Sequence, residues 1–105
     1  MTTSNPKLIT CIVQRGKADM VVDAAMAAGA QGATICYGRG TGVRERLGLS
    51  GLFIKPEKEI IYIVTKQEES EAVLEAVVDA AHLREKGQGF AFLHELDQAI
   101  GFLAE

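Results

Sequence analysis

The chain of 105 residues has no tryptophan, two prolines and two cysteines, and its formal net charge is only −3. This weak charge excludes a general nucleic-acid-binding or membrane-binding surface. Cys11 and Cys36 are too few for a disulfide framework and lack a CxxC spacing, so we expect two buried free thiols. No apolar run approaches the roughly 20 residues of a membrane span. The start, MTTSNPK, lacks the apolar core of a signal peptide. We therefore expect a cytoplasmic protein that is not embedded in a membrane.

Side chains suited to catalysis or to metal binding are also scarce. The two histidines, His82 and His94, form no metal-ligand spacing with each other or with the cysteines. We expect His82 at the end of a helix, as a cation near the helix C-terminus, and His94 on an edge strand. The sequence therefore predicts no catalytic residues, no metal site and no enzyme.

The remaining pattern predicts one domain, residues 1–105, in which strands and helices alternate. Segments rich in β-branched and aromatic residues predict strands at 7–14, 33–40, 59–65 and 90–96. Apolar residues at helical spacing predict helices at 18–28 and from Thr65 to about Ala81. Gly29 is placed to cap the first helix, and Thr65 and Glu68 have the spacing of a capping box for the second. Residues 41–56 show no period and predict a long loop.

The resulting order, βαββαβ, is the ferredoxin-like pattern of the α+β class. It predicts an antiparallel sheet in the spatial order 4-1-3-2, with both helices on one face. The loop after the second strand and the loop before the fourth then lie at the same end of the sheet, on opposite edges and roughly 14 Å apart. Both faces of the first and third strands are apolar, yet two helices cover only one face. We therefore expect another subunit on the second face, and a closed ring would bring the two loops together across an interface.

Both of these loops are rich in glycine and carry basic residues. The first, YGRGTGVRERLG (37–48), has Gly38, Gly40 and Gly42, and the second, REKGQGF (84–90), has Gly87 and Gly89. Such turns expose backbone N–H groups that cradle phosphate, and arginine and lysine supply the countercharge. Neither stretch has Walker or Rossmann spacing. From spacing alone, a twisting hairpin explains the first stretch equally well, and a helix cap with a turn explains the second.

On this βαββαβ order, the chain resembles the nitrogen-regulatory PII signalling family, in its PII-like branch. AQGATICYGRGTG resembles the segment that enters the family's long T-loop, HLREKGQGFAFL resembles its B-loop, and LDQAIGF resembles its final segment. The resemblance implies a homotrimer that binds an adenine nucleotide (AMP, ADP or ATP), or bicarbonate, as effector in the clefts between subunits. It also implies regulation of a partner enzyme or membrane transporter through the T-loop, in nitrogen or inorganic-carbon metabolism.

The resemblance assigns two sets of residues. The nucleotide-binding set is Thr34, Arg39, Gly40, Thr41, Gly42, Arg84, Gly87, Gln88, Gly89 and Phe90. Gln88 and Phe90 stand where typical members have an aspartate and a lysine, and Gly101 and Leu103 stand where they have two arginines. These departures are in keeping with the PII-like branch.

The partner-binding set lies in the loop 41–56 and consists of Val43, Arg44, Arg46, Leu47, Leu49, Ser50, Leu52 and Phe53. A long loop that mixes arginine with apolar side chains favours docking to a partner. The alternative is that its apolar side chains fold back on the domain. Two other functions stay open: a metal-binding trimer of the related CutA type, and an interaction module without a ligand.

Overall fold

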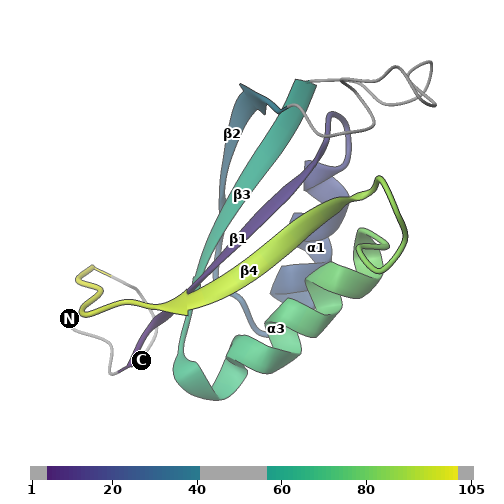
Figure 1. Ribbon diagram of the computed structural model, residues 1–105. Helices are drawn as coiled ribbons and strands as arrows, with labels where there is room; N and C mark the ends of the chain where they lie inside the picture. The colour runs from purple at the N-terminus through teal and green to yellow at the C-terminus, as the bar shows by residue number, and fades with distance from the viewer. Residues whose placement is uncertain (1–4, 41–56, 102–105) are drawn as a thin grey trace.

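The computed structural model describes residues 5–40 and 57–101 (Figure 1). Its elements follow the predicted order. They are β1 (Lys7–Gln14), α1 (Ala18–Ala27), β2 (Thr34–Arg39), β3 (Glu57–Thr65), α3 (Gln67–Ala80) and β4 (Gly89–Glu95). Each boundary lies within two residues of the sequence prediction wherever that prediction named one. Within the described residues, no helix is long and apolar enough to cross a membrane.

The four strands form one antiparallel sheet in the order β2-β3-β1-β4, with β1 and β3 in the centre. Figure 1 shows α1 and α3 together on one side of this sheet. The predicted ferredoxin-like α+β fold and the predicted strand order are therefore confirmed. β2 and β4 are the edge strands, and His94 lies on β4 as expected.

The core lies between the helices and the inner face of the sheet. Alternate residues of β1 and β3 point inward because successive side chains of a strand point to opposite faces. The buried apolar residues are Ile9, Cys11, Val13, Ala18, Val21, Ala25, Ala30, Ile61, Ile63, Val73, Val77 and Ala81. Burial of the Cys11 thiol raises its pKa to about 11, as is usual for a thiol in apolar surroundings.

Of the two predicted helix caps, the glycine cap of α1 is confirmed and the capping box of α3 is wrong. Gly29 follows α1 with a φ of 120°, and the amide of Ala30 donates to the carbonyl of Ala25, so the glycine cap is confirmed. The capping box of the second helix is wrong. Thr65 is the last residue of β3, and Lys66 occupies the N-cap position without a side-chain hydrogen bond. The period-2 burial of β3 continues through Thr65, which keeps this residue in the strand.

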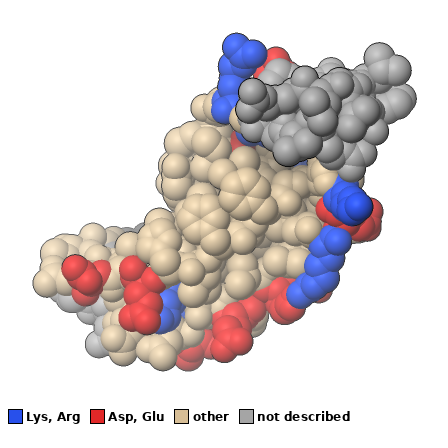
Figure 2. Space-filling view, viewed as in Figure 1, with Lys and Arg blue, Asp and Glu red and all other residues tan. Residues whose placement is uncertain are grey.

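Among residues 5–40 and 57–101, the outer face of the sheet is apolar and carries no helix. Its exposed side chains include Tyr62, Phe90 and Phe92, which are 39%, 55% and 43% exposed. Figure 2, in the same view as Figure 1, shows a broad uncharged surface over the strands, with charged side chains gathered around its border. Cys36 is exposed, so the prediction of two buried thiols is wrong for this residue. It lies on an edge strand and, opposite Ile60 in the pairing, belongs to the outer face.

Candidate functional site

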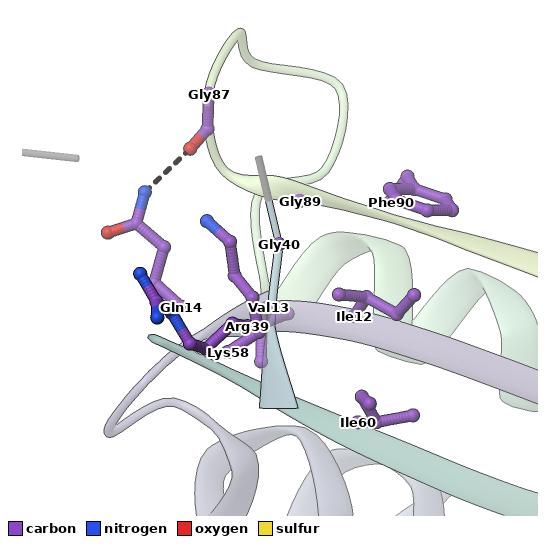
Figure 3. Close-up of a pocket in the computed structure, with 10 residues that line it drawn as sticks. All are labelled: Ile12, Val13, Gln14, Arg39, Gly40, Lys58, Ile60, Gly87, Gly89 and Phe90. Carbon is purple, nitrogen blue, oxygen red and sulfur yellow. Dashed lines mark hydrogen bonds between the residues drawn. The ribbon is translucent and has the colours of Figure 1, made fainter. Parts of the chain in front are cut away.

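A pocket of about 390 Å³ lies at the end of the sheet where β1 and β2 end and β3 and β4 begin. Figure 3 shows how its residues converge from all four strands. They are Ile12, Val13, Gln14, Arg39, Gly40, Lys58, Ile60, Gly87, Gly89 and Phe90. Both glycine-rich stretches therefore contribute to one pocket within a single chain.

The alternating glycines of the first stretch leave room beside β3. A Cβ added to Gly38 would lie 3.2 Å from Cδ1 of Ile60, and one added to Gly40 would lie 3.2 Å from Cγ of Lys58. Each is tighter than an ordinary van der Waals contact, so a side chain at either position would require Ile60 or Lys58 to shift slightly. The glycine at every second position therefore serves the outer face of the sheet, to which alternate residues of β2 point.

The second stretch needs glycine for its backbone. Gly87 and Gly89 have φ values of 80° and 132°, in the left-handed region that other residues rarely adopt. At Gly89 a Cβ would also overlap the carbonyl oxygen of Ile12. The segment can therefore pass close to β1 only as a glycine-rich turn.

Two side chains hold this turn, one from the last residue of β1 and one from the N-cap residue of α1. The amide Nε2 of Gln14 donates a hydrogen bond of 2.8 Å to the carbonyl oxygen of Gly87 (Figure 3). Nζ of Lys17 donates to Oε1 of Gln88 at 3.4 Å. Gln14 also pairs directly with Lys58 across β1 and β3. The turn and the middle of the sheet are thus joined by side chains.

The pocket is cationic at its rim and apolar along its floor. Among the described residues of its lining, the two charged ones, Arg39 and Lys58, are both basic, and Ile12, Ile60 and Phe90 supply apolar surface. Such a lining suits a ligand with an anionic group at one end and a flat apolar ring at the other.

The start of α1 is held by a buried acidic residue beside this site. Glu59, which is 7% exposed, lies on β3 next to Lys58 and faces the helices. Its Oε1 accepts hydrogen bonds from the backbone N–H groups of Gly16, at 2.9 Å, and Ala18, at 2.8 Å. The carboxylate thus occupies the N-terminus of α1 and satisfies donors that the helix itself leaves unpaired.

Five residues of the predicted nucleotide set line the pocket: Arg39, Gly40, Gly87, Gly89 and Phe90. Three others lie elsewhere. Thr34 begins β2, opposite Tyr62, and Gln88 contacts Lys17. Arg84 donates hydrogen bonds to Glu75 and Asp79 on α3, and the bond that it donates to Glu75 raises its pKa. Thr41, Gly42 and the whole partner-binding set, Val43 to Phe53, lie outside the described residues.

Sequence reasoning missed the central part of the pocket. The sequence indicates only strand positions for Ile12, Val13, Gln14 and Ile60. Lys58 falls between the predicted loop 41–56 and the predicted strand 59–65, but it lies within β3. The predicted strand order could have identified these residues, because it places the end of β1 and the start of β3 between the two glycine-rich segments.

Metal-ligating side chains are not grouped in the described part of the chain. Over residues 5–40 and 57–101, no three His, Cys, Asp or Glu are placed to hold a metal ion. The two histidines lie apart, His82 just after α3 with a φ of 55° and His94 on β4. No observation on these residues therefore favours the metal-binding alternative.

Comparison with known proteins gives one family. The sequence model of nitrogen regulatory protein P-II matches residues 6–102, which include both glycine-rich stretches and the segment between them. No single curated protein matches the chain.

Proposed function

Because the chain belongs to the nitrogen regulatory protein P-II family, we propose that it is a PII-like signalling protein that binds an adenine nucleotide in clefts between subunits, to which this pocket contributes. Members of this family are regulators, so the protein acts by binding and not as an enzyme. The proposed place of action is the cytoplasm, and the proposed assembly is a homotrimer that covers the apolar outer face of the sheet.

One observation carries the proposal: a single pocket joins Arg39 and Gly40 to the segment with Gly87 and Gly89. In a nucleotide complex, backbone N–H groups of the glycine-rich turns and the two basic side chains receive the phosphates. The adenine ring lies against Phe90 and the isoleucines, since aromatic side chains stack on flat rings. The volume of about 390 Å³ is within the range of small-molecule sites.

The basic rim also fits smaller anions. Bicarbonate carries a negative charge and hydrogen-bonding oxygens, but it has no ring for Phe90 and the apolar floor to contact. We therefore place AMP, ADP and ATP before bicarbonate as effectors. The partner is an enzyme or membrane transporter of nitrogen or inorganic-carbon metabolism, contacted through the loop 41–56.

Calorimetric titration with AMP, ADP, ATP and bicarbonate tests the ligand. Arg39→Ala removes a charged donor of the pocket and should weaken binding of the preferred nucleotide about 10- to 100-fold, the range for hydrogen bonds to charged groups. Arg84→Ala is the matched control, because Arg84 is engaged on α3 and its loss should change the affinity less than about twofold.

Three results would count against the proposal. Wild-type protein that binds none of the three nucleotides contradicts it directly. If Arg39→Ala and Arg84→Ala lose nucleotide affinity equally, the ligand does not bind specifically in this pocket. Thermal stabilisation by Cu²⁺ or Zn²⁺ but by no nucleotide would favour the metal-binding alternative.

A further inference from the structure

We infer that Gln14 links the two glycine-rich segments, so that a change at residues 84–89 is transmitted across the sheet to the start of the loop 41–56. The inference rests on the proposed function for its purpose, since it describes how an occupied pocket would affect the partner-binding loop. The contacts that carry it lie within a single chain.

The first contact joins the second glycine-rich segment to β1. Nε2 of Gln14 and the carbonyl oxygen of Gly87 are 2.8 Å apart, a good hydrogen bond between residues 73 positions apart. Figure 3 shows the Gly87 carbonyl pointing at the Gln14 amide from the rim of the pocket. Gly87 has a φ of 80°, so the hydrogen bond fixes a turn whose backbone is otherwise free to reorient.

The second contact joins β1 to β3. Gln14 and Lys58 are direct partners in the antiparallel pairing, so their side chains stand side by side on the outer face. Both line the pocket.

The third contact joins β3 to the base of the long loop. Lys58 is the pairing partner of Gly38, and Cγ of its aliphatic stem lies 3.2 Å from the position that a Cβ of Gly40 would take. Gly40 is the last described residue before the loop 41–56. A continuous row of contacts therefore runs from Gly87 through Gln14 and Lys58 to Gly40.

The side-chain amide of Gln14 has two alternative hydrogen-bond acceptors, the carbonyl oxygen of Gly87 and an anion bound in the pocket. In the structure it donates to the neutral carbonyl oxygen of Gly87. A phosphate or carboxylate oxygen in the pocket is a charged acceptor, and such hydrogen bonds are roughly twice as strong as neutral ones. An anion therefore competes for Nε2 and frees the peptide after Gly87. Because the C=O and N–H of a trans peptide point in opposite directions, rotation of this peptide turns the N–H of Gln88 toward the anion.

A pair of variants separates this link from simple loosening of the turn. Gln14→Leu removes the hydrogen-bond donor to Gly87 at similar side-chain size. Lys17→Met removes the hydrogen bond to Gln88 and leaves the contacts of Gln14 unchanged. Gln98→Leu, at an exposed glutamine beyond β4, controls for the change of residue type. Hydrogen exchange is followed over residues 84–88 and 37–42 in the ligand-free proteins.

In the ligand-free protein, Gln14→Leu should speed exchange about two- to tenfold over both segments, the range for loss of one hydrogen bond. Lys17→Met should speed it over 84–88 alone, and Gln98→Leu over neither. Faster exchange confined to 84–88 in Gln14→Leu, or an equal effect of Lys17→Met on 37–42, would overturn the inference.

A second arm adds saturating ADP. In wild-type protein ADP should alter exchange over 37–42, and in Gln14→Leu this response should be lost although ADP still binds by calorimetry. A full response in Gln14→Leu overturns the link. If ADP, AMP and ATP all fail to bind the wild-type protein, the proposed function fails, while the ligand-free arm still decides the inference.

Discussion

Gly89 lies directly against Ile12: a Cβ at Gly89 would overlap the Ile12 carbonyl oxygen, and its φ of 132° suits only glycine. We therefore expect Gly89→Ala to destabilise the fold by at least about 2 kcal/mol, because strain and backbone displacement add. Gly38→Ala is the matched control, since its Cβ would meet only the end of the Ile60 side chain, at 3.2 Å. Urea unfolding measures both, and a Gly89→Ala protein as stable as Gly38→Ala would contradict the packing seen here.

This difference decides which glycine can test the pocket. The sequence presents Gly87 and Gly89 as equivalent phosphate-binding candidates, but a weaker ligand affinity in Gly89→Ala would follow from a displaced β4 alone. Gly87→Ala also strains its turn, at a φ of 80°, but it lies outside β4 and leaves the strand in place, so it is the better of the two probes of ligand contact.

Glu59 gives a second stability prediction. In Glu59→Ala, the N–H groups of Gly16 and Ala18 lose their acceptor, so we expect a loss of about 2–4 kcal/mol in the free energy of unfolding. Glu59→Gln keeps a side-chain oxygen for both donors and loses only the charge, and it should cost about 1 kcal/mol. Urea unfolding of the three proteins gives the comparison. Equal losses in the two variants would show that the charge, and not the acceptor, holds the turn.

The Cys11 thiol predicts a change of stability at alkaline pH. Its pKa is raised from 9.0 to about 11 because burial disfavours the thiolate. A group with a raised folded-state pKa stabilises the fold below its unfolded pKa, and this contribution is lost as pH rises from about 9 to 11. The stability difference between wild-type protein and Cys11→Ala should therefore stay constant below pH 9 and shrink above it. A constant difference up to pH 11 would place the thiol in contact with water.

Much of the fold could be predicted because its pattern is local. Alternation of strand and helix segments fixed the element order, and the uniformly apolar β1 and β3 indicated a sheet with both faces to be covered. Details that depend on neighbouring strands could not be predicted. Thr65 carried a capping-box spacing but is held in β3 by the pairing with Lys7. Cys36 looked like a core thiol because the sequence does not say which face of an edge strand meets the helices.

The two ends of the pocket could be predicted from the sequence, but its middle could not. Glycine spacing and the family resemblance named the residues of its two ends, Arg39 and Gly40 on one side and Gly87 to Phe90 on the other. Gln14 and Lys58 carry no motif, and their place in the site follows from the register of β1 against β3. A register is set by many weak side-chain pairings together, which a single sequence does not display.

The proposed signalling role predicts coupling between the pocket and the loop 41–56. A bound nucleotide shifts the loop only if it has different affinities for the loop's states, and such couplings are typically about 1–3 kcal/mol. We expect saturating nucleotide to change hydrogen exchange over residues 43–55, and Gly42→Val to abolish the change while the protein stays folded. Identical exchange with and without nucleotide in the wild-type protein would leave the role without its mechanism.

The apolar outer face predicts the assembly. Phe92→Glu places a charge on this face, on the edge strand β4, where burial against another subunit would desolvate it at high cost. Light scattering should then return the 11.3 kDa chain for Phe92→Glu and a trimer for the wild-type protein. Met20→Glu is the matched control, because Met20 on α1 is likewise 43% exposed but lies on the helical side. It should leave the trimer intact. If Met20→Glu dissociates the assembly and Phe92→Glu does not, the subunits meet through the helices, and if the wild-type protein is itself a stable monomer, the outer face stays open to solvent.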